Sequence, residues 1–421
     1  MGLNNCSYFT KRFHMKSFVF CLLLSHGVFC LQAQPTLPVP NVFIITIDGV
    51  RWQEVFNGAD QRIIRNNQFV QDSSLTFDMF GGTTAMERKE KLMPFFWRTI
   101  ASKGQLHGNR LYGNKMNVSN PYNISYPGYN EIITGYADPF ILKNKPSLNR
   151  NSNLLEFLQQ QPAYKNAVVA FSSWDVFPAI INESRSNISV NSGFENMEPS
   201  TPTFELINSV QDGIQNKTGT RHDQLTFLNA KHYLGQHHPK VMMLGFGETD
   251  EFGHQKKYDQ YLQHINQVDQ MIASLWYYVQ TDSFYRNNSI FVITTDHGRG
   301  NKPGTWHSHG MVRGGSSETW MALMGPGIEP MGEIQEPAQF YQKQIAATIA
   351  SLIQQKFTAN HPVASAMELP SANKTNEAVR MEFTFQYNGM ASVLDTHSIL
   401  IWLIVFMTLG YIKRVSHKLA E

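Results

Sequence analysis

The chain has 421 residues, of which 42% are hydrophobic and 16% are charged. This composition allows a sizeable core and excludes general disorder, and the length allows one large domain or two to three ordinary ones. The basic excess lies in the two ends, residues 1–34 and 397–421, so the middle of the chain is slightly acidic, which argues against a nucleic-acid binder. All three cysteines lie in the first 30 residues, which disfavours a thiolate metal site, a catalytic cysteine and a disulfide scaffold.

The N-terminal residues 1–34 are predicted to be a secretory signal. Three basic residues precede an apolar stretch over residues 17–31, and a cleavage position follows near Ala33. Lipid attachment at Cys30 is disfavoured because the preceding Phe29 is larger than the small residue that usually stands there. Prolines at 35, 38 and 40 also argue against a helix that continues as an anchor.

The middle of the chain predicts strands that alternate with helices. The first half is expected to contain a strand over 41–47, a helix over 86–102, a loop over 120–129 that leads into a short helix, and a strand over 167–171. A polar surface excursion is expected over 182–220. After it we expect a strand over 240–246, a helix over 258–280, strands over 290–294 and 320–324, and a closing helix over 339–354. Such alternation predicts an α/β fold with a mainly parallel central sheet and helices on both faces.

The C-terminus contains a second apolar run, which predicts a transmembrane helix over 397–412. The run is short for a membrane span, but the flanking Lys413 can extend it by reaching to the interface. Basic residues follow it and predict a cytoplasmic tail over 413–421. The sequence therefore predicts a catalytic domain over 35–358, a linker over 359–396 and a single-pass protein of the secretory pathway, with its domain outside the cytoplasm (in the periplasm of a Gram-negative cell). A buried core helix is the alternative for the apolar run.

Residues of metal-ligand type follow three of the predicted strands. Asp48 follows the first strand, Asp250 and His254 follow the strand over 240–246, and Asp296 and His297 follow the strand over 290–294. Ligands of open α/β sheets bind beyond the carboxyl ends of the strands, so these side chains are expected to converge. A further pair of imidazoles comes from His307 and His309. Asp and His together suit zinc, and sometimes manganese or iron.

A candidate nucleophile lies in the segment Asn123-Ile-Ser-Tyr-Pro-Gly-Tyr129. Ser125 is expected at the start of a helix with Pro127 in its first turn, where free backbone N–H groups and the helix dipole favour an anion. A serine hydroxyl is a poor nucleophile at neutral pH, and a metal can activate it in place of a histidine base.

In this order the motifs resemble the alkaline phosphatase superfamily, nearest its nucleotide pyrophosphatase/phosphodiesterase branch and the bacterial secreted phosphatases with a threonine or serine nucleophile. The resemblance covers roughly residues 41–330. It implies that Asp48, Asp296 and His297 bind one divalent cation and that Asp250, His254 and His309 bind a second. Ser125 would lie between them, also as a metal ligand, and form a phosphoserine during hydrolysis of a phosphate ester. We prefer His309 to His307 because the family pattern has the histidine directly before a glycine. The implied cofactors are two divalent ions, most simply zinc.

Two departures leave the substrate open. Sulfatases of the superfamily need an arginine four residues after the modified Cys or Ser, and Tyr129 stands there, which makes a sulfatase the weaker alternative. The phosphate-binding arginine of the best-studied phosphatases has no clear counterpart, although Lys115, Arg299, Lys302 and Arg313 lie near the motifs. Hydrolysis of phosphate monoesters and hydrolysis of phosphate diesters are therefore both possible functions. A membrane-anchored phosphotransferase that modifies lipid or glycan is the alternative.

Overall fold

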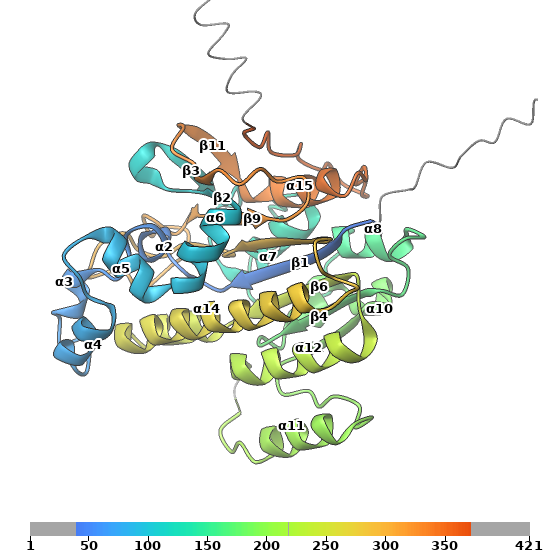
Figure 1. Cartoon of the computed structure of the whole chain (residues 1–421), viewed down its shortest axis with the longest axis horizontal. Coiled ribbons are helices and arrows are strands. Elements are labelled where there is room, and N and C mark those ends of the chain that lie inside the picture. The colour runs from blue at the N-terminus through green and yellow to red at the C-terminus, as the bar shows by residue number, and fades with distance from the viewer. Residues whose placement is uncertain (1–38, 218, 372–421) are drawn as a thin grey trace, which may run out of the picture. The chain divides into compact units, whose positions relative to one another are not determined.

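The structure is a computed structural model, which describes residues 39–217 and 219–371 (Figure 1). Its strands are β1 (Asn41–Ile47), β2 (Gly104–His107), β3 (Asn114–Asn117), β4 (Val168–Ser172), β5 (Ser189–Ser192), β6 (Val241–Phe246), β7 (Ser289–Thr294), β8 (Glu318–Thr319), β9 (Met321–Met324), β10 (Gly332–Glu333) and β11 (Ala338–Tyr341).

The α-helices are α2 (Trp52–Asn57), α3 (Gln61–Ile64), α4 (Ser73–Phe80), α5 (Ala85–Leu92), α6 (Ala101–Lys103), α7 (Ser125–Thr134), α8 (Leu154–Gln160), α9 (Phe177–Ile181), α10 (Glu183–Ser186), α11 (Pro202–Asp212), α12 (Asp223–His237), α13 (Glu248–His254), α14 (Tyr258–Thr281) and α15 (Ile345–Leu352). A π-helical turn spans Phe96–Ile100, and 3-10 turns span Arg110–Tyr112 and Gln342–Gln344.

A sheet of eight strands forms the centre of the described region, in the order β10-β2-β9-β7-β1-β6-β4-β5. Every neighbouring pair in it is parallel except the two pairs that β9 makes with β2 and β7. The fold therefore has the predicted α/β class with a mainly parallel central sheet, in which β9 is the strand that runs antiparallel to its neighbours. A smaller sheet, β11-β3-β8, lies beside it.

The two faces of the central sheet carry two hydrophobic clusters. Strand β1 supplies Phe43, Ile45 and Ile47 to one cluster and Val42 and Ile44 to the other, because successive side chains of a strand point to opposite faces. The first cluster is covered chiefly by α12 and α14, which lie in front of the sheet in Figure 1, and the second by α7, α8, α9 and α15. Burial of both faces explains why the central strands are almost continuously apolar.

Three predicted elements differ in the structure. The helix expected over 86–102 is interrupted after α5, because Pro94 cannot continue its hydrogen bonding, and a π-helical turn and α6 follow. The closing helix begins only at Ile345, since 338–341 form β11. The excursion over 182–220 contains α11 and also β5, whose pairing with β4 places it in the central sheet.

The short strands β2, β3, β8 and β10 were not predicted. Each has only two to four residues, too few to show a period, and β2 and β10 are paired only through partners distant in sequence. Residues 359–371, the start of the predicted linker, pack against the domain, where Met367 N donates to Thr348 Oγ1 and Ala364 N donates to Gly135 O.

Within the described residues, no helix combines the length and the apolar character that a membrane span needs. The predicted signal over 1–34, the predicted span over 397–412 and the predicted tail over 413–421 all lie outside those residues.

Candidate active site

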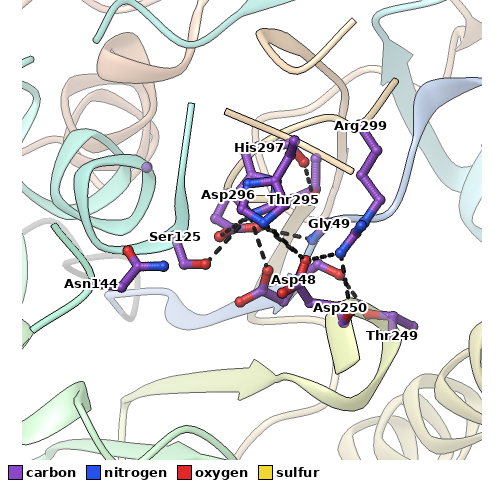
Figure 2. A network of polar contacts seen from close by, with 12 residues as sticks. Asp48, Gly49, Ser125, Asn144, Thr249, Asp250, Thr295, Asp296, His297 and Arg299 are labelled. Carbon is purple, nitrogen blue, oxygen red and sulfur yellow. Dashed lines mark hydrogen bonds and ion pairs between the residues drawn. The ribbon is translucent and has the colours of Figure 1, made fainter. Parts of the chain in front are cut away.

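Three neighbouring strands bring three carboxylates to one edge of the sheet (Figure 2). Asp48 follows β1, Asp250 lies in α13 directly after β6, and Asp296 follows β7. Strand β1 lies between β6 and β7 and is parallel to both, so the three carboxyl ends meet. Gly49 N donates to Asp296 Oδ1 at 3.0 Å, and Thr249 Oγ1 donates to Asp48 O at 2.5 Å, which ties the three loops together.

Gly49 is required here by space as well as by conformation. Its φ is +62°, and an added Cβ would lie 2.8 Å from Asp250 Oδ1 and 2.9 Å from Arg299 Nε. A side chain at this position would therefore displace the carboxylates from one another.

The buried His297 imidazole lies at the centre of the carboxylates. Its Nε2 is 3.4 Å from Asp48 Oδ1, 3.5 Å from Asp296 Oδ2 and 3.9 Å from Asp250 Oδ1. Asp48, Asp296 and His297 therefore offer three potential ligand atoms close to one another, all from buried residues. They are the three residues that the resemblance assigns to the first cation.

A second group lies directly beside the first. Asp250, His297 and His309 form it, with the His309 ring stacked on the His297 ring at a centroid distance of 3.8 Å. His254 Nε2 is 2.9 Å from Asp250 Oδ2 and 3.1 Å from His309 Nε2. The structure thus places the six predicted acid and imidazole ligands in one continuous cluster, and His297 lies against both groups.

The hydrogen bonds of the imidazoles fit a cation. His297 Nδ1 bonds to Gly298 O at 2.9 Å and His309 Nδ1 bonds to Asn123 O at 3.0 Å. A carbonyl only accepts, so each Nδ1 carries the proton, and in the neutral ring each Nε2 lone pair faces the carboxylates. This is the orientation of a histidine that ligates through Nε2.

Two carboxylate oxygens strengthen that fit. Asp48 Oδ1 and Asp296 Oδ2 are buried and have no hydrogen-bond partner among the described residues. Buried acceptors without donors are costly unless a positive charge lies between them. Lone pairs from two imidazoles and oxygens from three carboxylates therefore converge on space that suits a divalent cation.

The electrostatics of the protein alone point the same way. Burial raises the pKa of Asp296 to about 6, and burial with the charges of Asp296 and Asp250 raises the pKa of Asp48 well above its usual range. Burial also lowers the pKa of His297 to about 4 and that of His309 to about 3, which leaves both rings neutral at pH 7.

Asp250 is the exception among the three acids. Burial by itself would raise the pKa of Asp250, but the Arg299 guanidinium and the neighbouring histidines hold it well below the usual range. The Arg299 side chain is fully buried, forms an ion pair with the Asp250 carboxylate and donates to Asp250 O at 3.0 Å. Arg299 therefore pairs with the proposed metal ligand Asp250, whereas the sequence analysis considered it as a candidate for phosphate binding.

Ser125 is the first residue of α7 and lies at the edge of the cluster. Its Oγ is 3.3 Å from His297 Nε2, and the whole of α7 is buried. An added Cβ on Gly128 would lie 2.2 Å from Asp296 O, so this glycine lets α7 approach the loop after β7. Gln342 Nε2 donates to both Gly128 O and Asp296 O and holds the two segments together.

Two polar residues beside Ser125 were not identified from the sequence. Asn144 Oδ1 accepts from Tyr126 N at 2.9 Å, and Figure 2 shows its amide pointing toward Ser125. Tyr129 hydroxyl donates to Asp48 Oδ2 at 3.4 Å, and burial raises its pKa well above the usual value, which keeps the donor protonated. Asn144 belongs to an irregular loop, where no sequence motif indicates a function. Tyr129 drew notice in the sequence only because it stands where sulfatases need an arginine.

The other predicted phosphate contacts lie farther out. Lys115 is exposed on β3 of the small sheet, and Lys302 and Arg313 are exposed on the loop that carries His309. Among the described residues, no side-chain hydrogen bond or ion pair joins these three to the cluster. His307 packs against Phe69, with the ring centroids 5.9 Å apart, and its carbonyl accepts from Arg299.

A third group of potential ligands consists of Asp223, Glu248 and His264. Asp223 accepts from Gly247 N and Glu248 N at the start of α13, and Glu248 accepts from Asp223 N at the start of α12. His264 Nε2 lies 2.9 Å from Asp223 Oδ2 and 3.2 Å from Glu248 Oε2. These contacts cap two helices reciprocally, and they join α12, α13 and α14.

Comparison with known proteins identifies the family. The family model described as "Metalloenzyme superfamily" matches residues 34–354. No curated protein sequence matches the chain significantly.

Solved structures with a similar fold include the wild-type alkaline phosphatase PafA, at 10% identity and a TM-score of 0.52, over 79% of this chain and 99% of that one. The others include the lipoteichoic acid synthase LtaP from Listeria monocytogenes, at 10% identity and a TM-score of 0.49, over 78% of this chain and 75% of that one. A phosphonate monoester hydrolase from Silicibacter pomeroyi matches at 14% identity and a TM-score of 0.49, over 79% of this chain and 78% of that one.

Proposed function

Because the chain belongs to the metalloenzyme superfamily and has the alkaline phosphatase fold, we propose that it hydrolyses phosphate esters with Ser125 as the nucleophile. The observation that supports this most is the convergence of Asp48, Asp250 and Asp296 with neutral imidazoles beside a hydroxyl at a helix start. Such a site is suited to a doubly charged cation and to an anionic substrate at once.

The donor set suggests which residues hold the cations. Asp48, Asp296 and His297 would hold one, and Asp250, His254 and His309 the other, with His297 close to both groups. Mixed carboxylate and imidazole donors suit zinc. When bound, the cations would supply positive charge for the attacking and leaving oxygens.

The residues of the chain would then act as follows. Ser125 Oγ, having lost its proton to solvent, attacks phosphorus, and the bond from phosphorus to the leaving oxygen breaks. The leaving alkoxide takes a proton from water, and phosphoserine remains at position 125. A water molecule then attacks the phosphoserine, which releases phosphate and restores the hydroxyl.

Three groups are placed to assist this reaction. The backbone N–H of Ser125, the first residue of α7, favours a phosphoryl oxygen, whereas Tyr126 N donates to Asn144 Oδ1, Gly128 N donates to Ile124 O and Pro127 has no N–H. The Asn144 amide is a second donor on that side. Tyr129 orients Asp48, because its hydroxyl donates to the carboxylate.

The cellular location remains a proposal from the sequence. We propose that the signal over 1–34 and the span over 397–412 place the domain outside the cytoplasm. Protease digestion of intact cells, or of spheroplasts where an outer membrane encloses a periplasm, tests this, since a domain outside the cytoplasmic membrane is degraded and a cytoplasmic one is protected.

The function is tested by metal analysis combined with turnover of three esters. We expect about two divalent ions per chain, release of 4-nitrophenolate from 4-nitrophenyl phosphate or its bis-ester, and much slower release from 4-nitrophenyl sulfate. Acid quenching should trap phosphate on Ser125, which mass spectrometry detects. The surface variant Ser102→Ala is the matched control and should behave as wild type. Absence of turnover of both phosphate esters by the metal-loaded protein contradicts the proposal.

A further inference from the structure

Two loops flank the residue that carries the candidate nucleophile. The loop over 139–148 contacts the start of α7, where Asn144 Oδ1 accepts from Tyr126 N and Ser147 O accepts from the Tyr126 hydroxyl. The loop over 300–315 contacts the preceding segment, where His309 Nδ1 donates to Asn123 O. Ser125 lies between these two attachment points, so both loops border the same site.

Both loops expose large apolar side chains, of which Phe140 also contacts the Arg150 guanidinium, 5.0 Å from its ring centroid. Phe140, Leu142 and Leu148 belong to the first loop and Met311 and Val312 to the second, and these five form what we name the apolar rim. Their exposed fractions run from 51% to 94%. Single exposed apolar residues are ordinary, but five on the two loops that border one site indicate a contact surface.

The charges on the same loops have one sign. Residues 139–148 contain Lys143 and Lys145, residues 300–315 contain Lys302 and Arg313, and neither loop contains an acidic residue. All four cationic side chains are exposed. The middle of the chain is otherwise slightly acidic, so the loops differ from the rest of the domain. An anion with an apolar portion complements this combination.

We propose that the substrate is an amphiphilic phosphate ester, whose phosphate reaches Ser125 while its apolar group lies on the apolar rim. This inference rests on the proposed function and adds the substrate class. The cationic side chains of the loops attract the anion. Each methylene group that packs against the rim should raise kcat/KM by roughly twofold, which is less than the gain expected for a fully buried methylene.

The test compares esters that differ only in alkyl length. The full chain, loaded with metal, is assayed on n-alkyl phosphates and on n-alkyl 4-nitrophenyl phosphates with one to six carbons. Both series are used so that a monoesterase and a diesterase are each covered. We expect kcat/KM to rise with chain length in at least one series. Equal kcat/KM from methyl to hexyl overturns the inference while the proposed function stands, whereas no turnover of any ester contradicts the proposed function.

Variants locate the effect on the rim. Leu142→Ser and Val312→Ser should keep wild-type turnover of the methyl ester and lose most of the rise toward hexyl. Leu206→Ser is the matched control, because this leucine is also exposed, to an extent between Leu142 and Val312, but lies on α11, beyond α12 in Figure 1. A rise that survives in both rim variants places the apolar contact elsewhere and overturns the assignment of the rim.

The apolar ester has two sources, which a second arm distinguishes. Wild type and the two rim variants are assayed on anionic phospholipid in vesicles. Cleavage by wild type that the rim variants lose supports a lipid headgroup as the source. Cleavage of soluble hexyl esters without cleavage in vesicles supports a free amphiphile.

Discussion

Ser125 is the proposed nucleophile. Its hydroxyl lies 3.3 Å from His297 Nε2 at the buried start of α7. Ser125→Ala should lower kcat by about three orders of magnitude or more, because no other hydroxyl replaces the nucleophile. Bound metal, measured by elemental analysis, should stay near the wild-type amount, since the carboxylates and imidazoles are unchanged. A variant that retains full turnover would exclude Ser125 as the nucleophile.

We expect Arg299 to influence metal binding through its contact with Asp250. The guanidinium forms an ion pair with the Asp250 carboxylate and also donates to two carbonyls, so it fixes both the charge and the orientation of that acid. Arg299→Lys keeps the charge but loses the two-pronged geometry, and we expect roughly tenfold weaker metal binding, as is usual when a partner of a ligand is lost. Competition with a chelator measures it, and Arg313→Lys on the exposed loop is the control. Unchanged affinity in the first variant would contradict a positioning role.

Helix α14 is joined to the π-helical turn through one buried acid, Asp269. Its two oxygens accept from Phe95 N and Phe96 N, each at 2.8 Å. Burial raises its pKa to about 7, although the two backbone donors oppose this shift. The folded state therefore holds a proton that the unfolded state loses near its ordinary pKa of 3.8, so the stability from this group falls as pH rises from about 4 to about 7.

Asp269→Asn tests that sign. Wild type should be more stable than the variant at pH 5, by about 1 kcal/mol for the lost backbone hydrogen bond. This difference should shrink toward pH 8, because only wild type carries the ionisable group. Urea unfolding at both pH values measures it. A difference that grows with pH would show that the carboxylate is stabilised in its charged form.

Helix α13 carries two of the proposed ligands and is held by the group Asp223, Glu248 and His264. His264 lies between the two carboxylates, each of which caps the helix to which the other belongs. His264→Leu should let α13 shift and weaken metal binding by roughly tenfold, with little change in the substrate KM once metal is saturating. His237→Leu, on the exposed end of α12, is the control. Equal metal affinity in both variants would show that the group does not position α13.

At the scale of the whole molecule, removal of metal should lower stability as well as activity. The buried carboxylates of Asp48 and Asp296 and the partly buried carboxylate of Asp250 then face one another with little compensation apart from Arg299. A cation that binds only the folded state at about 1,000 times its Kd adds about 4 kcal/mol, so a chelator should lower Tm and zinc should restore it. A Tm and a turnover rate that are both insensitive to chelation would contradict a metal site in this cluster.

The sequence alone determined the central strands and the motif at the end of each. The runs at 41–47, 241–246 and 289–294 are mostly apolar because both faces of the sheet are covered, and this is a local signal. The acids and imidazoles that follow them gave the family and the fold, which the comparisons confirm. The interruption after α5 and strand β5 in a polar stretch were missed, because pairing partners and a single proline override the local pattern.

Only the tertiary structure decided how the functional side chains meet. The commitment of Arg299 to Asp250, the amide of Asn144 beside Ser125 and the position of Tyr129 against Asp48 each join residues at least 19 positions apart. A sequence pattern describes which residues share a strand or helix face, whereas these contacts depend on which loops the order of strands brings to one edge. Local chemistry therefore fixed what the site is made of, and chain topology fixed what each group contacts.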